Sequence, residues 1–367
     1  MQSPEPNTEE VATDAGALDG PATVERLDPH GLLGRIEALP EQCADARRRW
    51  AGLELPASLR QTDHVAVLGM GGSAIAGSIL RALASSAGRK PVDVVRGYDL
   101  PPFVGARTLV VACSHSGNTE ETLSAFRQAL DSGAQAVAVT TGGRLAELAQ
   151  HAGCPMLNYR YDGEPRSALG CQLMALLAVG ERTGLLASQD SAAAEAVALM
   201  REERERIGYA APVKGNPAKQ LALRLRGRLP VVVGAGMLSA AAYRWKTQFN
   251  ENSECWALHE ELPELDHNTV VGFGLPEDLV PRLRVVFLRH EGLHPRVLLR
   301  YDATAEALSE AGVSHETVEV RGESPLAQAL HAVYLGDFVS YYLALLYGVE
   351  PSPVAALERL KEKLAGR

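Results

Sequence analysis

A short polar turn, SHSGNT, follows an apolar run and precedes an acidic, helical pattern. Its hydroxyl groups belong to Ser114, Ser116 and Thr119. A helix needs only one N-cap residue, and Asn118 with Glu121 already forms a capping-box-like pair. The hydroxyl groups therefore exceed what helix capping requires. Neutral hydroxyls and backbone amides, without a lysine or metal ligands, suit a phosphate monoester that binds reversibly.

A second turn, GMGGS, stands where another apolar run gives way to a helical pattern, and it contains Gly71, Gly72 and Ser73. Glycines let the backbone approach a ligand, and free amides at a helix N-terminus favour an anion. Alone, the motif is equally compatible with an ordinary strand-to-helix turn, since it matches neither the dinucleotide nor the Walker pattern. In a parallel sheet, however, the carboxyl ends of neighbouring strands lie together. We therefore expect the two turns to converge on one side of the sheet.

The elements that position these turns are short apolar runs that alternate with helical patterns, which is typical of a buried parallel sheet flanked by helices. The predicted strands are His64–Leu68, Pro91–Arg96, Thr108–Cys113, Gln135–Thr140, Leu229–Val233, Leu283–Leu288 and Glu316–Val320. The second group begins with LPVVVGAGMLSAAAYRW, which repeats the order of strand, glycine turn, small residue and helix seen in HVAVLGMGGSAIAGSIL. We predict an α/β fold of two related subdomains, each a mostly parallel sheet flanked by helices in a flavodoxin-like three-layer sandwich.

The same patterns predict the domain organisation. Residues 1–24 are acidic and lack apolar periodicity, so we expect a disordered tail. The first subdomain covers residues 25–190 and carries the phosphate-binding turns, and the second covers residues 216–350. A helix rich in Ala, Glu and Arg links them within residues 191–215, and an amphipathic helix closes the chain within residues 351–367.

Length, charge and cysteine content narrow the class of protein. A chain of 367 residues is long for a single core, and its net charge of −9 argues against a nucleic-acid binder. Five scattered cysteines without a CxxC pair predict neither a disulfide framework nor a structural zinc site, and they fit a reducing cytoplasm. We expect neither a secretion signal nor a membrane span, because acids precede the first base and no long apolar run is evident.

The two turns together resemble those of a known family. SHSGNTEET resembles the phosphosugar-binding S-x-S-G-x-T signature of sugar isomerase (SIS) domains, and with GMGGS it resembles the bifunctional phosphoglucose/phosphomannose isomerase family. The similarity runs from about Leu53 to the C-terminus. Relatives commonly have an aromatic residue where this chain has His115, a change that we expect to be tolerated. The resemblance implies that the sugar phosphate is bound by Gly71, Gly72, Ser73, Ser114, Ser116 and Thr119.

The segment Phe249–Phe273 concentrates carboxylates and imidazoles, and it is the richest source of acid–base groups in the sequence. Metal binding is one interpretation, but HEELPELDH is not HExxH, and Pro263 would interrupt any helix that aligned His259 with His267. A solvated acidic face is the simpler interpretation for most of its glutamates.

Two residues of this segment carry the resemblance further. Aldose–ketose isomerisation needs a base that moves a proton between C1 and C2 through an enediol, and a second group that opens the sugar ring. The NEN element around Glu251 and the HN element at His267 resemble those of the family, at the family's separation. The resemblance implies Glu251 as the enediol base and His267 as the ring-opening acid–base. In the family this histidine comes from the neighbouring subunit, so an obligate homodimer with a shared active site is also implied.

The resemblance implies two further site residues, and the chain also differs from its relatives at one position near Glu251. Arg166 matches a PR-x-x-x-G element and would stabilise the enediolate, although it could also be a surface arginine after a proline turn. Lys361 matches a lysine that lines the site, although Lys363 in the same amphipathic helix is an alternative. Relatives continue NEN with Ala-Lys, where this chain has Glu254 at the second position. Its charge would make Glu251 harder to ionise at close range, whereas solvent would screen it at the surface.

These observations predict a cytoplasmic, metal-independent isomerase that interconverts glucose 6-phosphate or mannose 6-phosphate with fructose 6-phosphate. No cofactor is required, because the proton returns to the adjacent carbon. Two alternatives stay open: a phosphosugar sensor without catalysis, and a SIS enzyme that acts on another aldose phosphate. The sequence shows no helix-turn-helix pattern or basic arm before the first SIS unit, which counts against a transcriptional regulator.

Overall fold

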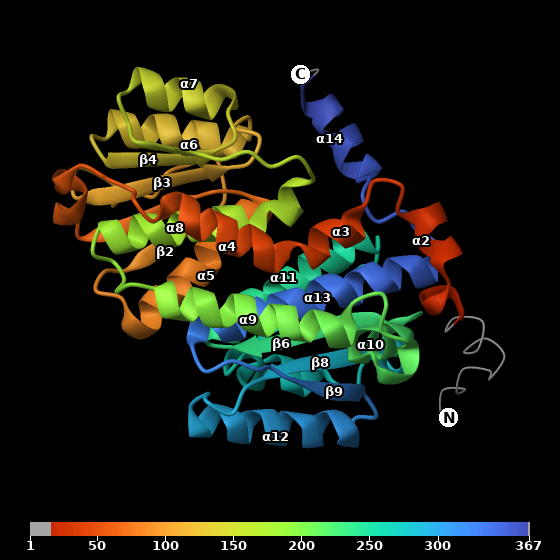
Figure 1. The fold of residues 1–367 in the computed structure, drawn as a ribbon. Coiled ribbons are helices and arrows are strands. Elements are labelled where there is room, and N and C mark those ends of the chain that lie inside the picture. The colour runs from red at the N-terminus through yellow and green to blue at the C-terminus, as the bar shows by residue number, and fades with distance from the viewer. Residues whose placement is uncertain (1–15, 366–367) are drawn as a thin grey trace.

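A computed structural model describes residues 16–365, which form two parallel β-sheets with layers of helices around and between them (Figure 1). The first sheet has the strand order β2-β1-β3-β4-β5, and the second has the order β7-β6-β8-β9. All neighbouring strands pair in parallel, so the predicted fold class is confirmed. The strands are β1 (His64–Leu68), β2 (Val92–Val95), β3 (Thr108–Ser114), β4 (Gln135–Thr140), β5 (Met156–Asn158), β6 (Leu229–Ala235), β7 (Leu258–Leu262), β8 (Leu283–Arg289) and β9 (Ser314–Glu319).

Helices cover both faces of the first sheet, and alternate strand residues supply the two faces. Val65 and Val67 of β1 belong to the cluster that includes α5 and α8, whereas Ala66 and Leu68 belong to the cluster that includes α6 and α7. Phe126 fills the centre of that outer cluster and is fully buried. These helices span Gly71–Ala87 (α5), Glu120–Asp131 (α6), Gly143–His151 (α7) and Leu169–Arg182 (α8).

The second sheet is covered mainly by α11, α13 and α10 on its inner face and by α12 on its outer face. After β7 the chain forms short 3-10 turns instead of a long crossover helix. The helices of this half are α10 (Pro217–Leu225), α11 (Met237–Asn252), α12 (Pro295–Glu310), α13 (Pro325–Tyr347) and α14 (Ala355–Ala365). The 3-10 turns of the chain are η1 (Ala57–Gln61), η2 (Pro165–Ala168), η3 (Val213–Gly215), η4 (Glu264–His267), η5 (Thr269–Gly272) and η6 (Val280–Arg282).

Helix α13 runs through the middle of the molecule, between the two sheets (Figure 1). By length and composition it could cross a membrane, but the side chains of its apolar window are all buried inside the protein. The expectation that the chain lacks a long apolar run is therefore wrong, since this run forms the protein core. It packs against α5 and α11 and against four other helices: α2 (Pro21–Leu27), α3 (Leu32–Glu37), α9 (Asp190–Ile207) and α10. One cluster of buried residues accordingly extends from Leu18 to Leu346 and includes both subdomains.

The N-terminal segment differs in part from its prediction. Residues 1–15 of the predicted disordered tail lie outside the described residues. Residues 16–24 are mostly helical: Leu18 is fully buried, and the Asp19 carboxylate lies 2.9 Å from Lys219 Nζ. A single buried leucine and one ion-paired aspartate anchor this stretch, so the lack of apolar periodicity was a poor guide there. The chain continues through α2, α3 and then α4 (Leu39–Trp50) to the first sheet.

Two strands, β5 and β7, were not predicted. β7 has the sequence LHEEL and lies at the edge of the second sheet, where it pairs only with β6. Because an edge strand has a neighbouring strand on one side only, part of it lies in solvent. It therefore tolerates acidic residues, which had suggested a solvated face. β5 is three residues long and also lies at an edge, where burial imposes little apolar pattern.

Candidate active site

The two hydroxyl-bearing turns lie next to each other at the carboxyl edge of the first sheet. β1 and β3 are neighbours, but the chain leaves β1 toward β2 and leaves β3 toward β4. Their ends thus frame the switch point at which open α/β sheets bind ligands. GMGGS follows β1 and SHSGNT follows β3, and a Cβ atom on Gly69 would lie 3.0 Å from the carbonyl oxygen of Cys113. The predicted convergence of the two turns is therefore present in the structure.

Local hydrogen bonds hold the hydroxyl groups of the serine turn. The buried Ser114 Oγ accepts from the Gly117 amide at 3.1 Å and lies 3.0 Å from Thr119 Oγ1. Ser116 Oγ accepts from the Asn118 amide at 3.2 Å. Each hydroxyl has one proton, and Ser114 and Thr119 use one of their two protons in their mutual bond. One of these protons and that of Ser116 are left to donate to an anion.

The predicted capping of the following helix by Asn118 and Glu121 is wrong. Thr119 occupies the N-cap position of α6 and makes no side-chain capping bond. The Asn118 side chain instead donates to the Ser116 carbonyl at 3.1 Å and accepts from the Arg144 amide at 3.2 Å. It ties the serine turn to the start of α7, so the first amides of α6 have no side-chain cap.

The glycine turn fits closely against the segment that carries Arg166. Gly71 has a φ of 49°, a conformation that favours glycine. A Cβ atom on Gly72 would lie 3.2 Å from the Pro165 carbonyl oxygen and 3.3 Å from the Arg166 Cα atom. A side chain at position 72 would therefore press on η2, and glycine allows the first turn of α5 to approach Arg166.

A chain of hydrogen bonds joins the glycine turn to the serine turn. Gln172 Nε2 donates to Ser73 Oγ at 3.1 Å and to the Tyr159 hydroxyl at 3.0 Å. The Tyr159 hydroxyl lies 3.1 Å from His115 Nδ1. Burial lowers the pKa of His115, which favours a neutral ring at neutral pH. Sequence reasoning missed Gln172 and Tyr159, because neither belongs to a motif and only the fold brings them to this edge.

Arg166 and Glu251 meet beside these turns. The guanidinium is almost completely buried: Nε donates to Asn252 Oδ1 at 2.7 Å, and Nη2 donates to the carbonyls of Pro351 at 2.6 Å and Ser352 at 2.9 Å. Nη1 lies 3.7 Å from Glu251 Oε2, and the Glu251 side chain is 31% exposed. Burial lowers the pKa of Arg166, while the neighbouring Glu251 carboxylate opposes that shift. A fixed cation thus stands beside an accessible carboxylate.

Buried polar groups on α11 and α13 hold this pair in place. Arg244 Nη2 donates to the Arg166 carbonyl at 3.0 Å and to Asp337 Oδ2 at 2.8 Å. Asn252 Nδ2 donates to Ser340 Oγ at 2.9 Å. Burial raises the pKa of Asp337, and Arg244 counteracts that shift. Asp337 and Ser340 were missed in the sequence because α13 is otherwise so apolar that nothing marks its few polar residues.

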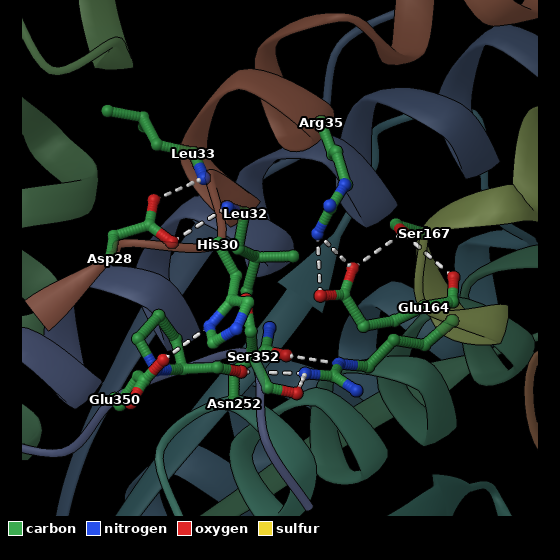
Figure 2. A network of polar contacts seen from close by, with 12 residues as sticks. Asp28, His30, Leu32, Leu33, Arg35, Glu164, Ser167, Asn252, Glu350 and Ser352 are labelled. Carbon is green, nitrogen blue, oxygen red and sulfur yellow. Dashed lines mark hydrogen bonds and ion pairs between the residues drawn. The ribbon is translucent and has the colours of Figure 1, made fainter. Parts of the chain in front are cut away.

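A second set of polar contacts joins Arg35 and Ser167 to Glu164, and His30 to Glu350 (Figure 2). Arg35 Nη1 on α3 donates to both carboxylate oxygens of Glu164, at 2.6 and 2.7 Å. Ser167 Oγ donates to the Glu164 carbonyl at 2.8 Å. His30 Nδ1 lies 2.6 Å from Glu350 Oε1. The N-terminal helices are therefore tied to η2 and to the segment that precedes α14.

Among the described residues, the structure does not join His267 or Lys361 to the Arg166–Glu251 pair. His267 ends η4, Lys361 lies on α14, and both are exposed. Among residues 16–365, no recorded hydrogen bond or ion pair joins either of them to Glu251 or Arg166. In the same range, no group of three or more His, Cys, Asp or Glu side chains is arranged to hold a metal ion.

Glu254 stands where its charge has little effect on Glu251. It is exposed and has a φ of 49° just beyond the end of α11. The chain turns back there, and the Cys255 amide donates to the Phe249 carbonyl at 3.0 Å. Because the carboxylate faces solvent, its interaction with Glu251 is screened.

Comparisons with known proteins agree with this geometry. A family model described as the SIS domain matches residues 58–161, and one described as the bacterial phospho-glucose isomerase C-terminal SIS domain matches residues 214–364. A relative from Caldicellulosiruptor bescii, named bifunctional phosphoglucose/phosphomannose isomerase, is 38% identical over 89% of this chain and 97% of its own. A relative of the same name from Aquifex aeolicus is 39% identical over 81% of this chain and 88% of its own. A solved structure of a hypothetical protein from Thermus thermophilus shares the fold, with a TM-score of 0.73, 19% identity and coverage of 98% and 95%.

Proposed function

Because the chain belongs to the bifunctional phosphoglucose/phosphomannose isomerase family, we propose that it interconverts glucose 6-phosphate and mannose 6-phosphate with fructose 6-phosphate. The observation that carries this proposal is the position of the Arg166–Glu251 pair relative to the phosphate-binding turns. Gly72 of the first turn approaches the Arg166 backbone directly, and Arg166 in turn lies 3.7 Å from Glu251. A sugar whose phosphate is held at the turns can extend over both side chains.

Each part of this site has a distinct role in the mechanism. The amides at the start of α5 and the hydroxyls of Ser114, Ser116 and Thr119 hold the phosphate. Glu251 removes the proton from C2 of the open-chain aldose and returns it to C1 of the enediol. Arg166 stabilises the negative oxygen of the enediolate. Its protein contacts fix it in advance, so little reorganisation is needed as charge develops.

One base can serve both aldoses. Glucose 6-phosphate and mannose 6-phosphate differ only in configuration at C2, and that configuration is lost when the enediol forms. The phosphate and the remaining sugar carbons are common to both. The C2 protons of the two aldoses lie on opposite faces of this enediol, so Glu251 alone serves both substrates if the open-chain sugar turns about its C2–C3 bond.

We assign His267 to the active site of a second copy of this chain, as ring-opening acid–base with Lys361 beside it. The support is that His267 is exposed and that α14 displays an unpaired apolar face. Leu357, Leu360 and Leu364 are 41%, 53% and 53% exposed, and their spacing puts them on one side of the helix. A homodimer would cover these leucines. Five free cysteines likewise support a cytoplasmic enzyme.

Proton exchange in heavy water tests the proposed reaction. Wild-type protein should incorporate deuterium at C2 of glucose 6-phosphate and mannose 6-phosphate and at C1 of fructose 6-phosphate. Glu251→Gln should lose exchange with all three, while the exposed neighbour variant Glu254→Gln should keep it. Undiminished exchange by Glu251→Gln would remove this residue as the base. Binding of all three sugars by the wild type without any exchange would instead favour a sensor.

Mixing two inactive variants tests the shared site. If His267 acts across the dimer, Glu251→Gln and His267→Gln chains form hybrids with one intact site, and about a quarter of wild-type activity returns. The Glu251→Gln chain mixed with Glu251→Gln/His267→Gln should stay inactive, because no intact site can form. The absence of recovery in the first mixture, with exchange of subunits confirmed, would place His267 in its own chain's site or outside catalysis.

A further inference from the structure

The second subdomain has a switch point of its own, and an open cavity of about 700 Å³ stands there. β6 and β8 are neighbours, but the chain leaves β6 toward β7 and leaves β8 toward β9. Gly236 and Met237, at the junction of β6 and α11, line the cavity, and so do Gly292 and Leu293 after β8. The cavity thus occupies the place in the second sheet that the phosphate turns occupy in the first.

The cavity and the active site lie at opposite ends of the same pair of packed helices, α5 and α11. α5 carries Ser73 in its first turn, at the active site, and Arg81 and Ser85 further along it line the cavity. α11 begins at the cavity and carries Glu251 at its far end. At 1.5 Å per residue, Met237 and Glu251 are about 21 Å apart along the helix. The cavity is therefore separate from the site of isomerisation.

In the cavity, the places that correspond to those of the catalytic groups in the active site are occupied by cationic side chains. In the active site, the helix of the other subdomain contributes the carboxylate of Glu251. In the cavity, the helix of the other subdomain contributes the guanidinium of Arg81. Arg96, which follows β2, is a second cation at the lining. Such a site can hold an anion, but it lacks the base that isomerisation requires.

Within the described part of the chain, the two guanidinium groups have no acidic partner. Among residues 16–365, neither Arg81 nor Arg96 forms an ion pair with a carboxylate. Arg96 Nη2 donates to Ser78 Oγ at 2.6 Å, and its guanidinium lies 5.5 Å from the centre of the Tyr243 ring. Of the described lining residues, Glu261 alone is acidic, so the cavity has more positive than negative side chains. This charge balance favours an anionic ligand in a protein whose net charge is −9.

Neutral polar groups complete the lining. Ser239 at the first turn of α11, Gln328 at the start of α13, and Ser85 and Ser86 on α5 provide donors and acceptors around the two arginines. The ring atom His259 Nε2 is buried and has no hydrogen-bond partner among the described residues. The volume lies within the range of small-molecule sites and accommodates a phosphorylated monosaccharide.

We propose that this cavity is a second, non-catalytic binding site for a sugar phosphate. The phosphate lies against Arg81 and Arg96, and the sugar hydroxyls reach Ser239 and Gln328. The proposal does not depend on the isomerase activity, because the residues that form the cavity take no part in the proposed proton transfer.

Counting bound fructose 6-phosphate by titration calorimetry tests this site on the full chain. Glu251→Gln protein is used, so that the ligand is not converted during the measurement. It should bind two molecules per chain, and the further change Arg81→Gln with Arg96→Gln should leave one. Adding Ser114→Ala with Ser116→Ala instead should remove the other. The exposed α6 variant Arg127→Gln is the matched control and should keep both.

Four outcomes would contradict this proposal separately from the isomerase proposal. One molecule per chain before any arginine is changed that stays bound after both are changed, or two molecules after both are changed, would overturn the second site. Inorganic phosphate that binds at the arginines where fructose 6-phosphate does not would overturn the sugar phosphate as its ligand. Because Arg96 also contacts Ser78, the single change Arg81→Gln is a second test that spares this packing. It should weaken binding at the second site about tenfold, and unchanged affinity would contradict the proposal.

Discussion

Arg166 and Glu251 come from different subdomains, yet Arg166 Nη1 lies 3.7 Å from Glu251 Oε2. The other nitrogens of the guanidinium are engaged by Asn252 Oδ1 and by the carbonyls of Pro351 and Ser352. Nη1 is the nitrogen that faces the carboxylate. An enediolate formed by Glu251 would therefore develop its charge next to a cation that the protein already holds in place.

Replacing Arg166 by lysine should lower kcat about 100- to 1000-fold and change KM little. Lysine keeps the charge but cannot reproduce the planar contacts to Asn252 and the two carbonyls, so its ammonium is poorly placed for the enediolate. Steady-state kinetics with glucose 6-phosphate and mannose 6-phosphate measure this. Arg89→Lys, at an exposed position, is the control. A kcat that falls by less than about threefold would show that Arg166 does not act on the developing charge.

Replacing Asn252 by alanine should lower kcat about tenfold and destabilise the fold by about 1–3 kcal/mol. The change leaves Arg166 Nε without a partner in a buried place, and it removes the bond that Ser340 Oγ accepts, although Ser340 Oγ still donates to the Asp337 carbonyl. Asn250→Ala is the matched control, because Asn250 donates to the Cys255 carbonyl at 2.9 Å and does not touch Arg166. Urea unfolding and kcat are measured for both variants. Equal losses of kcat would mean that Asn252 contributes only to stability and does not position the arginine.

The double change Ser114→Ala with Ser116→Ala should raise KM for both aldoses about 10- to 100-fold, because the phosphate loses the Ser116 donor and the Ser114 hydroxyl that orients Thr119. The turnover at saturating substrate should change much less, since proton transfer occurs elsewhere in the site. Ser132→Ala, at the exposed C-terminal end of α6, should leave KM as in the wild type. If the two serines only shape the turn, the double variant will melt at a lower temperature and keep its KM.

The stability of the protein should depend on His115 at mildly acidic pH. Burial lowers the pKa of His115 from its ordinary value of 6.5. As the pH falls below 6.5, His115 binds a proton in the unfolded chain but stays neutral in the folded chain. The free energy of unfolding therefore decreases until the pH reaches the lower pKa of the folded state.

Replacing His115 by phenylalanine should remove this share of the pH dependence. Urea unfolding of both proteins between about pH 7.5 and 5.5 should show the variant gaining stability relative to the wild type as the pH falls. His151→Phe, on the exposed side of α7, should follow the wild type. Parallel curves for His115→Phe and the wild type would mean that this ring does not contribute to the pH dependence.

The sequence predicted those features of the fold that depend on local pattern. β1 and β4 have the predicted bounds, because each is an apolar run that ends at a polar or glycine turn. The approach of the glycine turn to the serine turn follows from the rule that parallel strands end at one edge. β7 was missed because one of its five side chains is buried, so this edge strand lacks the apolar signature.

Pairings between distant elements could not be predicted in the same way. The guanidinium of Arg244 bonds to Asp337 on α13 and to the Arg166 carbonyl, and these three residues are far apart in the sequence. Asn252 belongs to the NEN element, yet its contact with Arg166 depends on how η2 packs against α11. Such contacts are set by the packing of the two subdomains, and no local spacing encodes that packing.

The burial of α13 between the two sheets has a consequence for how this duplicated protein unfolds. The helix comes from the end of the second subdomain, but its side chains belong to the cluster that also contains β1, α5 and α8. Removing it would expose apolar surface of both halves at once. The two subdomains therefore depend on the same buried helix. They should unfold together in one cooperative transition, and neither subdomain alone would have a fully buried core.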